Sequence, residues 1–135
     1  MEFLKKQPTV KAPAERFTGD AWFDVIAQGE PPSRIRVNVV RFAPGARNGW
    51  HRHAVGQTLH VTEGRGLIQS RGEQVTEIGP GDTVVIPPNA RHWHGSAPGT
   101  MMCHLAMSET NEKGEATSWF EPVSDADYAK APAKA

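Results

Sequence analysis

The histidines of this chain fall in groups whose spacing suits metal binding and proton transfer. His51 and His53 are two residues apart, so on a β-strand both imidazoles lie on one face. His92 and His94 repeat this spacing, and His104 follows them. A metal ion bound by ring nitrogens at roughly 2.1 Å needs such convergence, together with a third or fourth ligand from elsewhere in the chain. The pattern therefore predicts a histidine-rich site, in which a neutral imidazole near pH 7 can also act as a general base.

The rest of the sequence indicates that short strands present these histidines. Thirteen glycines and eleven prolines in 135 residues would interrupt helices along the whole chain, which excludes a helical bundle. Apolar stretches recur at roughly eight- to twelve-residue intervals with turn residues between them, as in sandwiches and barrels. The predicted fold class is therefore all-β. Strands are expected at 21–26, 34–42, 50–61, 67–69, 75–78, 83–86 and 101–107, and a short helix at 124–127.

The length suits one domain, residues 1–135, with its core at about 33–108. The first residues are polar and contain proline, so we expect an N-terminal arm over 1–16. The Ala- and Lys-rich end predicts a mobile tail over 129–135.

Charge and cysteine content narrow the class of partner. Fifteen Lys and Arg residues balance fifteen Asp and Glu residues, so the formal net charge is zero and nucleic acid is not an expected partner. No stretch approaches the ~20 apolar residues of a membrane helix, and no signal peptide is recognised. The single cysteine, Cys103, forms no internal disulfide, which suits a reducing compartment. We expect a cytoplasmic protein that handles a small neutral molecule.

Glycine and proline residues frame the histidines in two motifs. Residues 45–64 and 81–96 resemble the cupin motifs G-x5-H-x-H-x3-E-x6-G and G-x5-P-x-G-x2-H-x3-N, with sixteen residues between them. Gln57 stands for the usual Glu, Asn89 for a Gly and Ser96 for an Asn. Asn89 suits a left-handed turn because asparagine tolerates that conformation better than other non-glycine residues. The resemblance implies a cupin-type double-stranded β-helix, or jelly-roll barrel, with a short C-terminal helix or tail.

Several short runs resemble the small bacterial hydroxynitrile lyases of the cupin superfamily, which are manganese-dependent. These runs are 44–47, 50–53, 56–59, 92–95 and 104–106. The resemblance implies metal ligands His51, His53, Gln57 and His92, catalytic proton-handling groups His94 and His104, and a substrate pocket containing Asn38, Val40, Phe42 and Asn48. Asn48 stands where those lyases tend to carry a Thr. The expected ion is Mn²⁺, although histidine and glutamine also suit Fe²⁺, Ni²⁺ or Zn²⁺.

Gln57 is the departure with the clearest chemical meaning. An amide oxygen in place of a carboxylate leaves the charge of a divalent ion uncompensated. The ion should therefore be a stronger Lewis acid and be bound less tightly.

Strand alternation assigns the remaining aromatic and histidine side chains. His60 should point away from the metal, because Gln57 lies on the opposite face of its strand. His104 lies either in the pocket or buried in the core. Trp50 and Trp93 should face the outer side of the sheet, packed internally or against a partner. With Trp22 and Trp119 they suggest a covered outer face, and the resemblance implies a homodimer or homotetramer.

Three functions follow from these patterns. The first is a metal-dependent lyase that cleaves and forms cyanohydrins by Lewis-acid and histidine acid–base catalysis. The second is a metal-dependent cupin dioxygenase acting on a small aromatic or diketone. The third is a non-catalytic cupin that binds a small ligand.

Overall fold

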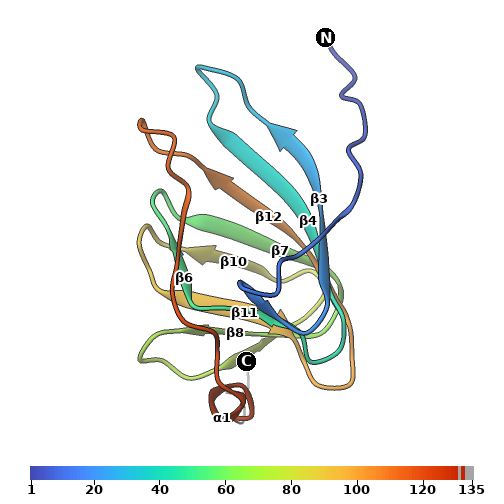
Figure 1. The fold of residues 1–135 in the computed structure, drawn as a ribbon, viewed down its shortest axis with the longest axis vertical. Helices are drawn as coiled ribbons and strands as arrows, with labels where there is room; N and C mark the ends of the chain where they lie inside the picture. Colours follow the sequence, from blue (N-terminus) through green and yellow to red (C-terminus); the bar gives the residue numbers. More distant parts are fainter. Residues whose placement is uncertain (131, 133–135) are drawn as a thin grey trace.

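The structure is a computed structural model that describes residues 1–130 and residue 132. Most of the tail predicted at 129–135 lies outside these residues. Within them the chain forms short strands and one helix (Figure 1). The elements are β1 (Val10–Lys11), β2 (Phe17–Thr18), β3 (Ala21–Gln28), β4 (Ile35–Phe42), β5 (Arg47–Asn48), β6 (His51–His53), β7 (Gln57–Gly64), β8 (Gly66–Ser70), β9 (Thr76–Ile78), β10 (Thr83–Ile86), β11 (His92–Ser96), β12 (Met102–Glu109), β13 (Thr117–Trp119) and α1 (Asp125–Tyr128).

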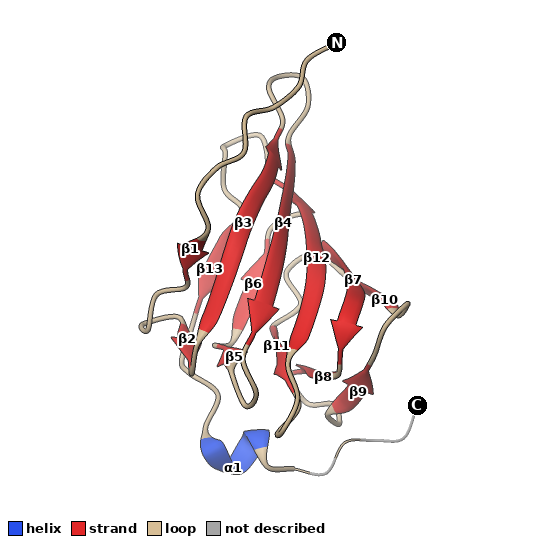
Figure 2. Cartoon of the chain, turned by 90° about the vertical axis from the view of Figure 1, so that its right-hand side faces the viewer, coloured by secondary structure: helices blue, strands red, loops and turns tan. Residues whose placement is uncertain are grey.

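Two antiparallel sheets face each other and curl around one interior. One sheet has the order β1-β3-β4-β12-β7-β10. The other has the order β13-β6-β11-β5-β2, with β8 pairing β11 and β9 pairing β8. Figure 2 shows β3, β4, β12 and β7 in front of β13, β6 and β11. The all-β jelly-roll barrel predicted from the sequence is confirmed.

Alternation along β4 and β12 decides which side chains enter the barrel. His104 pairs with Val40, and Ala106 pairs with Asn38, so these four residues share the inner face. The interior at this level is apolar, with the side chains of Phe42, Leu59, Val61 and Met102 almost fully buried. The inner face thus combines a hydrophobic core with a few polar side chains that strand alternation aims inward.

The turn before β11 joins the two histidine-bearing regions. Asn89 has a φ of 62°, in the left-handed region that the sequence predicted for this residue. Its N–H donates to the His53 carbonyl oxygen at 2.8 Å. The turn therefore ties the start of the second motif directly to the end of β6.

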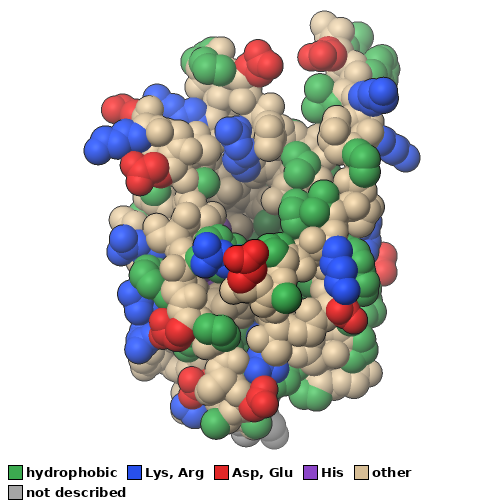
Figure 3. Space-filling view, in the orientation of Figure 1, with side chains coloured by type: hydrophobic (Ala, Val, Ile, Leu, Met, Phe, Trp, Pro, Cys, Tyr) green, Lys and Arg blue, Asp and Glu red, His purple; other side chains and the backbone are tan. Residues whose placement is uncertain are grey.

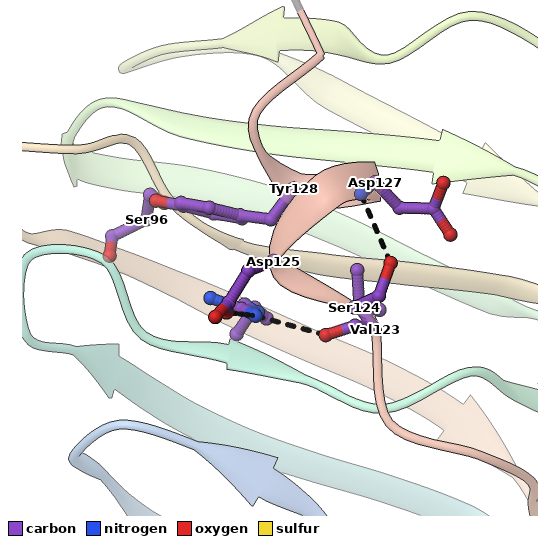
Figure 4. Close-up of polar contacts among 7 residues, drawn as sticks. Ser96, Val123, Ser124, Asp125, Asp127 and Tyr128 are labelled. Carbon is purple, nitrogen blue, oxygen red and sulfur yellow. Dashed lines mark hydrogen bonds and ion pairs between the residues drawn. The ribbon is translucent and has the colours of Figure 1, made fainter.

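The C-terminal segment is fastened to the sheet by a group of contacts that we call the C-terminal clamp. Arg47, on β5, donates through Nη2 to the Val123 carbonyl at 2.9 Å and to Asp125 at 2.7 Å. Its guanidinium lies 4.4 Å from the ring centroid of Tyr128. The Tyr128 hydroxyl donates to the Ser96 carbonyl at 2.7 Å (Figure 4). These contacts connect α1 to β5 and β11.

The predicted short helix is confirmed as α1. Ser124 precedes it in an extended conformation, and its Oγ accepts the Asp127 N–H at 3.1 Å (Figure 4). This is the N-cap interaction expected at the start of a helix. No helix in the described part of the chain is long and apolar enough to cross a bilayer.

Trp50 and Trp93 pack on the outer side of their sheet against this chain's own C-terminal segment. Trp93 is fully buried and Trp50 nearly so, in a cluster with Val123 and Tyr128. The internal packing considered for these two side chains is therefore correct, and they are not available to a partner. Trp22 remains 36% exposed.

Part of the segment predicted as an N-terminal arm, residues 1–16, joins a sheet, because Val10–Lys11, as β1, pairs with β3. The strand that follows the arm, β2 at Phe17–Thr18, pairs with β5. Between them the chain turns near Pro13, whose carbonyl accepts the N–H groups of Arg16 and Phe17 at 3.0 and 3.1 Å. This turn lies over the open end of the barrel interior, because both Pro13 and Arg16 line the cavity described below.

Candidate metal centre

Three histidines from two adjacent strands converge on one point inside the barrel. His51 and His53 leave the same face of β6, and His92 pairs with His51 across the β6–β11 ladder. The nitrogen atoms that they offer lie within 4.8 Å of one another. All three are buried, with 2%, 5% and 0% of their surface exposed respectively. These residues could hold a metal ion.

Hydrogen bonds to the outer ring nitrogens orient these imidazoles. His51 Nδ1 donates to the Gly49 carbonyl at 2.8 Å, and His92 Nδ1 donates to the Ala90 carbonyl at 2.9 Å. Because a carbonyl can only accept, Nδ1 carries the proton in both rings and Nε2 keeps its lone pair. His53 Nδ1 lies 3.1 Å from Thr117 Oγ1 on β13. Such hydrogen bonds to Nδ1 are typical of histidines that bind a metal through Nε2.

Three atoms near the convergence point have no hydrogen-bond partner among the described residues. His53 Nε2, His92 Nε2 and Gln57 Oε1 are buried without a hydrogen bond among the described residues. Buried polar atoms are normally paired, so several orphans around one point indicate a missing ligand. Gln57, the first residue of β7, also lies within reach of the His53 side chain. A divalent cation would satisfy all of these atoms, so the residues fit the metal that the sequence predicts.

Burial keeps the three imidazoles in the form that binds metals. Desolvation, together with the neighbouring His92, lowers the pKa of His53 to about 4. Desolvation also lowers the pKa of His92, and it lowers that of His51 well below the usual value. All three rings are therefore neutral near pH 7 and need lose no proton from Nε2 before binding a cation.

A cavity of about 450 Å³ leads to this centre. Figure 3 shows the molecule hollowed on the face that Figure 1 presents. The predicted pocket residues Asn38, Val40 and Asn48 line the cavity, whereas Phe42 does not. Phe42 is buried behind the lining, with its ring centroid 5.9 Å from that of His94 and 5.5 Å from that of His104. Phe42 is the last residue of β4, which is more buried at this end than in its middle. Phe42 therefore packs against the two histidines from the hydrophobic core.

His94 and His104 form a hydrogen-bonded pair in the cavity wall. His94 Nδ1 and His104 Nε2 are 3.0 Å apart, and both residues line the cavity. Burial lowers the pKa of His104 to about 4, and burial together with the neighbouring His104 lowers that of His94 well below its usual value. His104 is thus both a buried histidine and a pocket residue, which joins the two alternatives that the sequence left open.

Asn48 is attached to His94 at two points. Its Oδ1 accepts the His94 backbone N–H at 2.9 Å, which fixes the orientation of the amide. Its Nδ2 then lies 3.2 Å from His94 Nε2. The same Nδ2 lies 3.4 Å from His94 Nδ1, so the amide contacts both ring nitrogens. His60 lies outside this network, hydrogen-bonded to Thr83 at 2.8 Å, as strand alternation predicted.

The sequence motifs missed several residues that line the cavity. Trp119 stacks on His51, with ring centroids 4.7 Å apart, and Thr117 orients His53. Both lie on β13, outside the two motifs. Trp119 had been expected to help cover an outer face, and it lines the cavity instead. Arg16 and Phe17 reach the cavity from the N-terminal turn. Only the pairing of β13 with β6 and of β2 with β5 brings these residues to the site.

Comparison with known proteins gives consistent matches. Residues 38–108 match the Cupin domain family. The chain is 46% identical over 122 residues to the (R)-mandelonitrile lyase of Granulicella tundricola, covering 90% of this chain and 92% of that protein. A cupin-like protein from Thermotoga maritima has a TM-score of 0.85 at 34% identity, with 98% of each chain covered. A polyketide cyclase from Streptomyces resistomycificus has a TM-score of 0.70 at 17% identity, covering 95% of this chain and 90% of that one, which is a likeness of fold alone.

Proposed function

This chain belongs to the cupin family, and from that premise we propose that it is a metal-dependent lyase that cleaves and forms cyanohydrins. The observation that carries the proposal is a pair of sites facing one cavity. The candidate ligands His51, His53 and Gln57 line the cavity, with His92 beside them, and the buried His94 lines it as the proposed base. The relative named (R)-mandelonitrile lyase supports the reaction class.

The bound cation would be held by His51 Nε2, His53 Nε2, His92 Nε2 and Gln57 Oε1. When present it supplies Lewis-acid polarisation of an oxygen or nitrile of the substrate. The ligands named here are all neutral, so none of them reduces the charge that the substrate meets. We propose Mn²⁺ as the ion.

His94 is the group that moves the proton. Its Nε2 lone pair takes the hydroxyl proton of the cyanohydrin, and the C–C bond to the nitrile carbon breaks as the carbonyl forms. The departing cyanide then receives that proton from His94 Nε2 and leaves as hydrogen cyanide, which restores the neutral ring. His94 Nδ1 lies 3.0 Å from His104 Nε2. A neutral His104 that accepts the Nδ1 proton would stabilise the imidazolium formed between these steps.

The proposal is tested by removing and restoring the metal. Protein treated with a chelator should release no cyanide from (R)-mandelonitrile above the buffer rate, and adding Mn²⁺ should restore release. Parallel reconstitution with Fe²⁺, Ni²⁺ and Zn²⁺ ranks the ions, and an oxygen electrode with an electron-rich phenol checks for oxidative chemistry. Equal cyanide release by the metal-free and metal-loaded protein would refute the proposal.

A further inference from the structure

The lining of the cavity contains one permanently charged side chain, and it is a cation. Arg16 lines the cavity together with apolar, neutral polar and histidine side chains, and no described residue of the lining is acidic. A divalent ion on histidine nitrogens and the Gln57 amide adds positive charge without an opposing carboxylate. The electrostatic potential inside the cavity therefore favours an anionic group on the ligand.

Contacts of its backbone and side chain hold Arg16 at this position. The Gly49 N–H donates to the Arg16 carbonyl at 2.8 Å, and the Arg16 N–H donates to the Pro13 carbonyl at 3.0 Å. The guanidinium carbon lies 5.6 Å from the ring centroid of Trp119, which itself stacks on His51. The indole of Trp119 thus lies between the guanidinium of Arg16 and the imidazole of His51, a candidate metal ligand.

The guanidinium of Arg16 is free to bind a ligand. Arg47 and Arg71, by contrast, pair with Asp125 at 2.7 Å and with Glu121 at 2.8 Å. Over the residues that the structure describes, the Arg16 side chain makes neither an ion pair nor a hydrogen bond. Its planar group of five N–H donors matches the two oxygens of a carboxylate, which it can bind through two parallel hydrogen bonds.

We propose that Arg16 is a specificity-determining residue that binds a carboxylate on the substrate, so that the preferred substrates are carboxylate-bearing aldehydes and their cyanohydrins. The inference rests on the proposed function, which supplies the reaction at the aldehyde or cyanohydrin end of the substrate. We propose this anionic substrate in place of the small neutral molecule expected from the net charge. The net charge is a sum over the whole chain, whereas the substrate meets only the side chains that line the cavity.

The test compares two substrates of matched shape. These are the cyanohydrin of 4-formylbenzoate and the cyanohydrin of its methyl ester, which differ in the charge at the end away from the reacting carbon. The wild-type protein loaded with Mn²⁺ should release cyanide from the carboxylate with the higher kcat/KM. Arg16→Gln should lower kcat/KM for the carboxylate by roughly ten- to hundredfold, mainly through KM, and leave the ester unchanged. Arg16→Lys, which keeps the charge without the planar fork, should lie between them.

Arg52→Gln is the matched control. Arg52 lies between His51 and His53 on β6, is exposed, and has its guanidinium 5.6 Å from the Phe120 ring. Arg52 lies next to the candidate metal ligands in the chain but does not line the cavity. Arg52→Gln therefore removes one positive charge from outside the cavity, and the preference for the carboxylate should persist. A preference that survives in Arg16→Gln, or disappears equally in Arg52→Gln, would overturn the assignment.

A binding experiment separates this inference from the proposed reaction. Calorimetry measures 4-formylbenzoate and its methyl ester binding to the wild-type protein and to Arg16→Gln. Tighter binding of the carboxylate that depends on Arg16, without cyanide release from either cyanohydrin, would support Arg16 and reject the lyase. Cyanide release from both substrates at equal kcat/KM, with equal binding of both aldehydes, would support the lyase and reject the role of Arg16.

Discussion

Burial keeps both rings of the His94–His104 pair neutral near pH 7, the form that the proposed proton transfer requires. Both rings lie in the cavity wall, and burial lowers the pKa of each. A base whose conjugate acid is disfavoured returns its proton readily, which suits a reaction that must protonate cyanide after each cleavage. Asn48 fixes the position of His94 by accepting its backbone N–H through Oδ1 at 2.9 Å. His94 Nδ1 faces His104 at 3.0 Å, which leaves Nε2 for the substrate proton in the proposed reaction.

Replacing His94 should remove the proton transfer and leave the metal in place. His94→Ala is expected to lower kcat for cyanide release by about 10²- to 10⁴-fold, the usual contribution of a positioned base. Metal analysis of the purified variant should give the wild-type content. His60→Ala is the control, because His60 contacts Thr83 away from the cavity, and it should keep wild-type activity. A fully active His94→Ala variant would exclude His94 as the base.

Gln57 sets the balance between holding the metal and activating the substrate. Gln57→Glu adds a carboxylate beside His53 and offsets one charge of the cation. The variant should lose Mn²⁺ to a chelator more slowly than the wild type and turn over mandelonitrile more slowly. The measurements are the rate of metal loss and kcat on the reconstituted protein. Faster metal loss in Gln57→Glu would show that the residue does not contact the ion.

At the scale of elements, β13 carries the two side chains that contact His51 and His53 from outside the candidate metal centre. It pairs with β6 so that Thr117 lies opposite His53 and Trp119 opposite His51. One short strand thus positions a hydrogen-bond partner for one histidine and an aromatic surface for another. The site depends on a strand that carries none of the candidate ligands.

Removing the Thr117 hydroxyl should weaken metal binding without changing the ligands. Thr117→Val keeps the shape of the side chain but leaves His53 Nδ1 without its partner at 3.1 Å. The affinity for Mn²⁺, measured by competition with a chelator, should fall by roughly 10- to 100-fold, as for other second-shell changes. Ser118→Val is the control, since Ser118 neighbours Thr117 on the same strand and pairs with Arg52. An unchanged affinity in Thr117→Val would mean that other contacts orient His53.

At the scale of the molecule, five buried histidines make stability depend on pH. Burial lowers the pKa of His53 and His104 to about 4 and also lowers those of His51, His92 and His94. In the unfolded chain histidines titrate near pH ~6.5, so between ~6.5 and ~4 the unfolded state binds more protons. The stability that these groups contribute is therefore present above pH ~6.5 and is lost as the pH falls.

Urea unfolding of the chelator-treated protein should show this loss. The free energy of unfolding should decrease between pH 7 and 4.5, by about 1.4 kcal/mol for each unit of pKa depression fully expressed. His104→Gln should flatten the slope relative to the wild type, because one titrating group has been removed. A free energy of unfolding that stays constant over this range would contradict the neutral, buried state assigned to these rings.

The sequence predicted most of the fold and the grouping of the candidate ligands, because both depend on local pattern. The two-residue spacing predicted that His51 and His53 share one face of β6. Alternation left His104 either in the pocket or in the core, and its pairing with Val40 puts it on the inner face. Trp119 and Arg16 could not be predicted in this way, since they reach the cavity only through pairing of strands distant in the chain. The dimer or tetramer expected from the sequence stays a prediction.

The position of β13 in the chain has a consequence for biosynthesis. Every strand that bears a candidate ligand precedes β13 in the sequence. During translation these strands leave the ribosome first, and Thr117 and Trp119, which contact His53 and His51, follow them. Until β13 has emerged and paired with β6, the histidines stand on an incomplete sheet edge. If the proposed metal centre forms, its high-affinity state is thereby reached only late in synthesis.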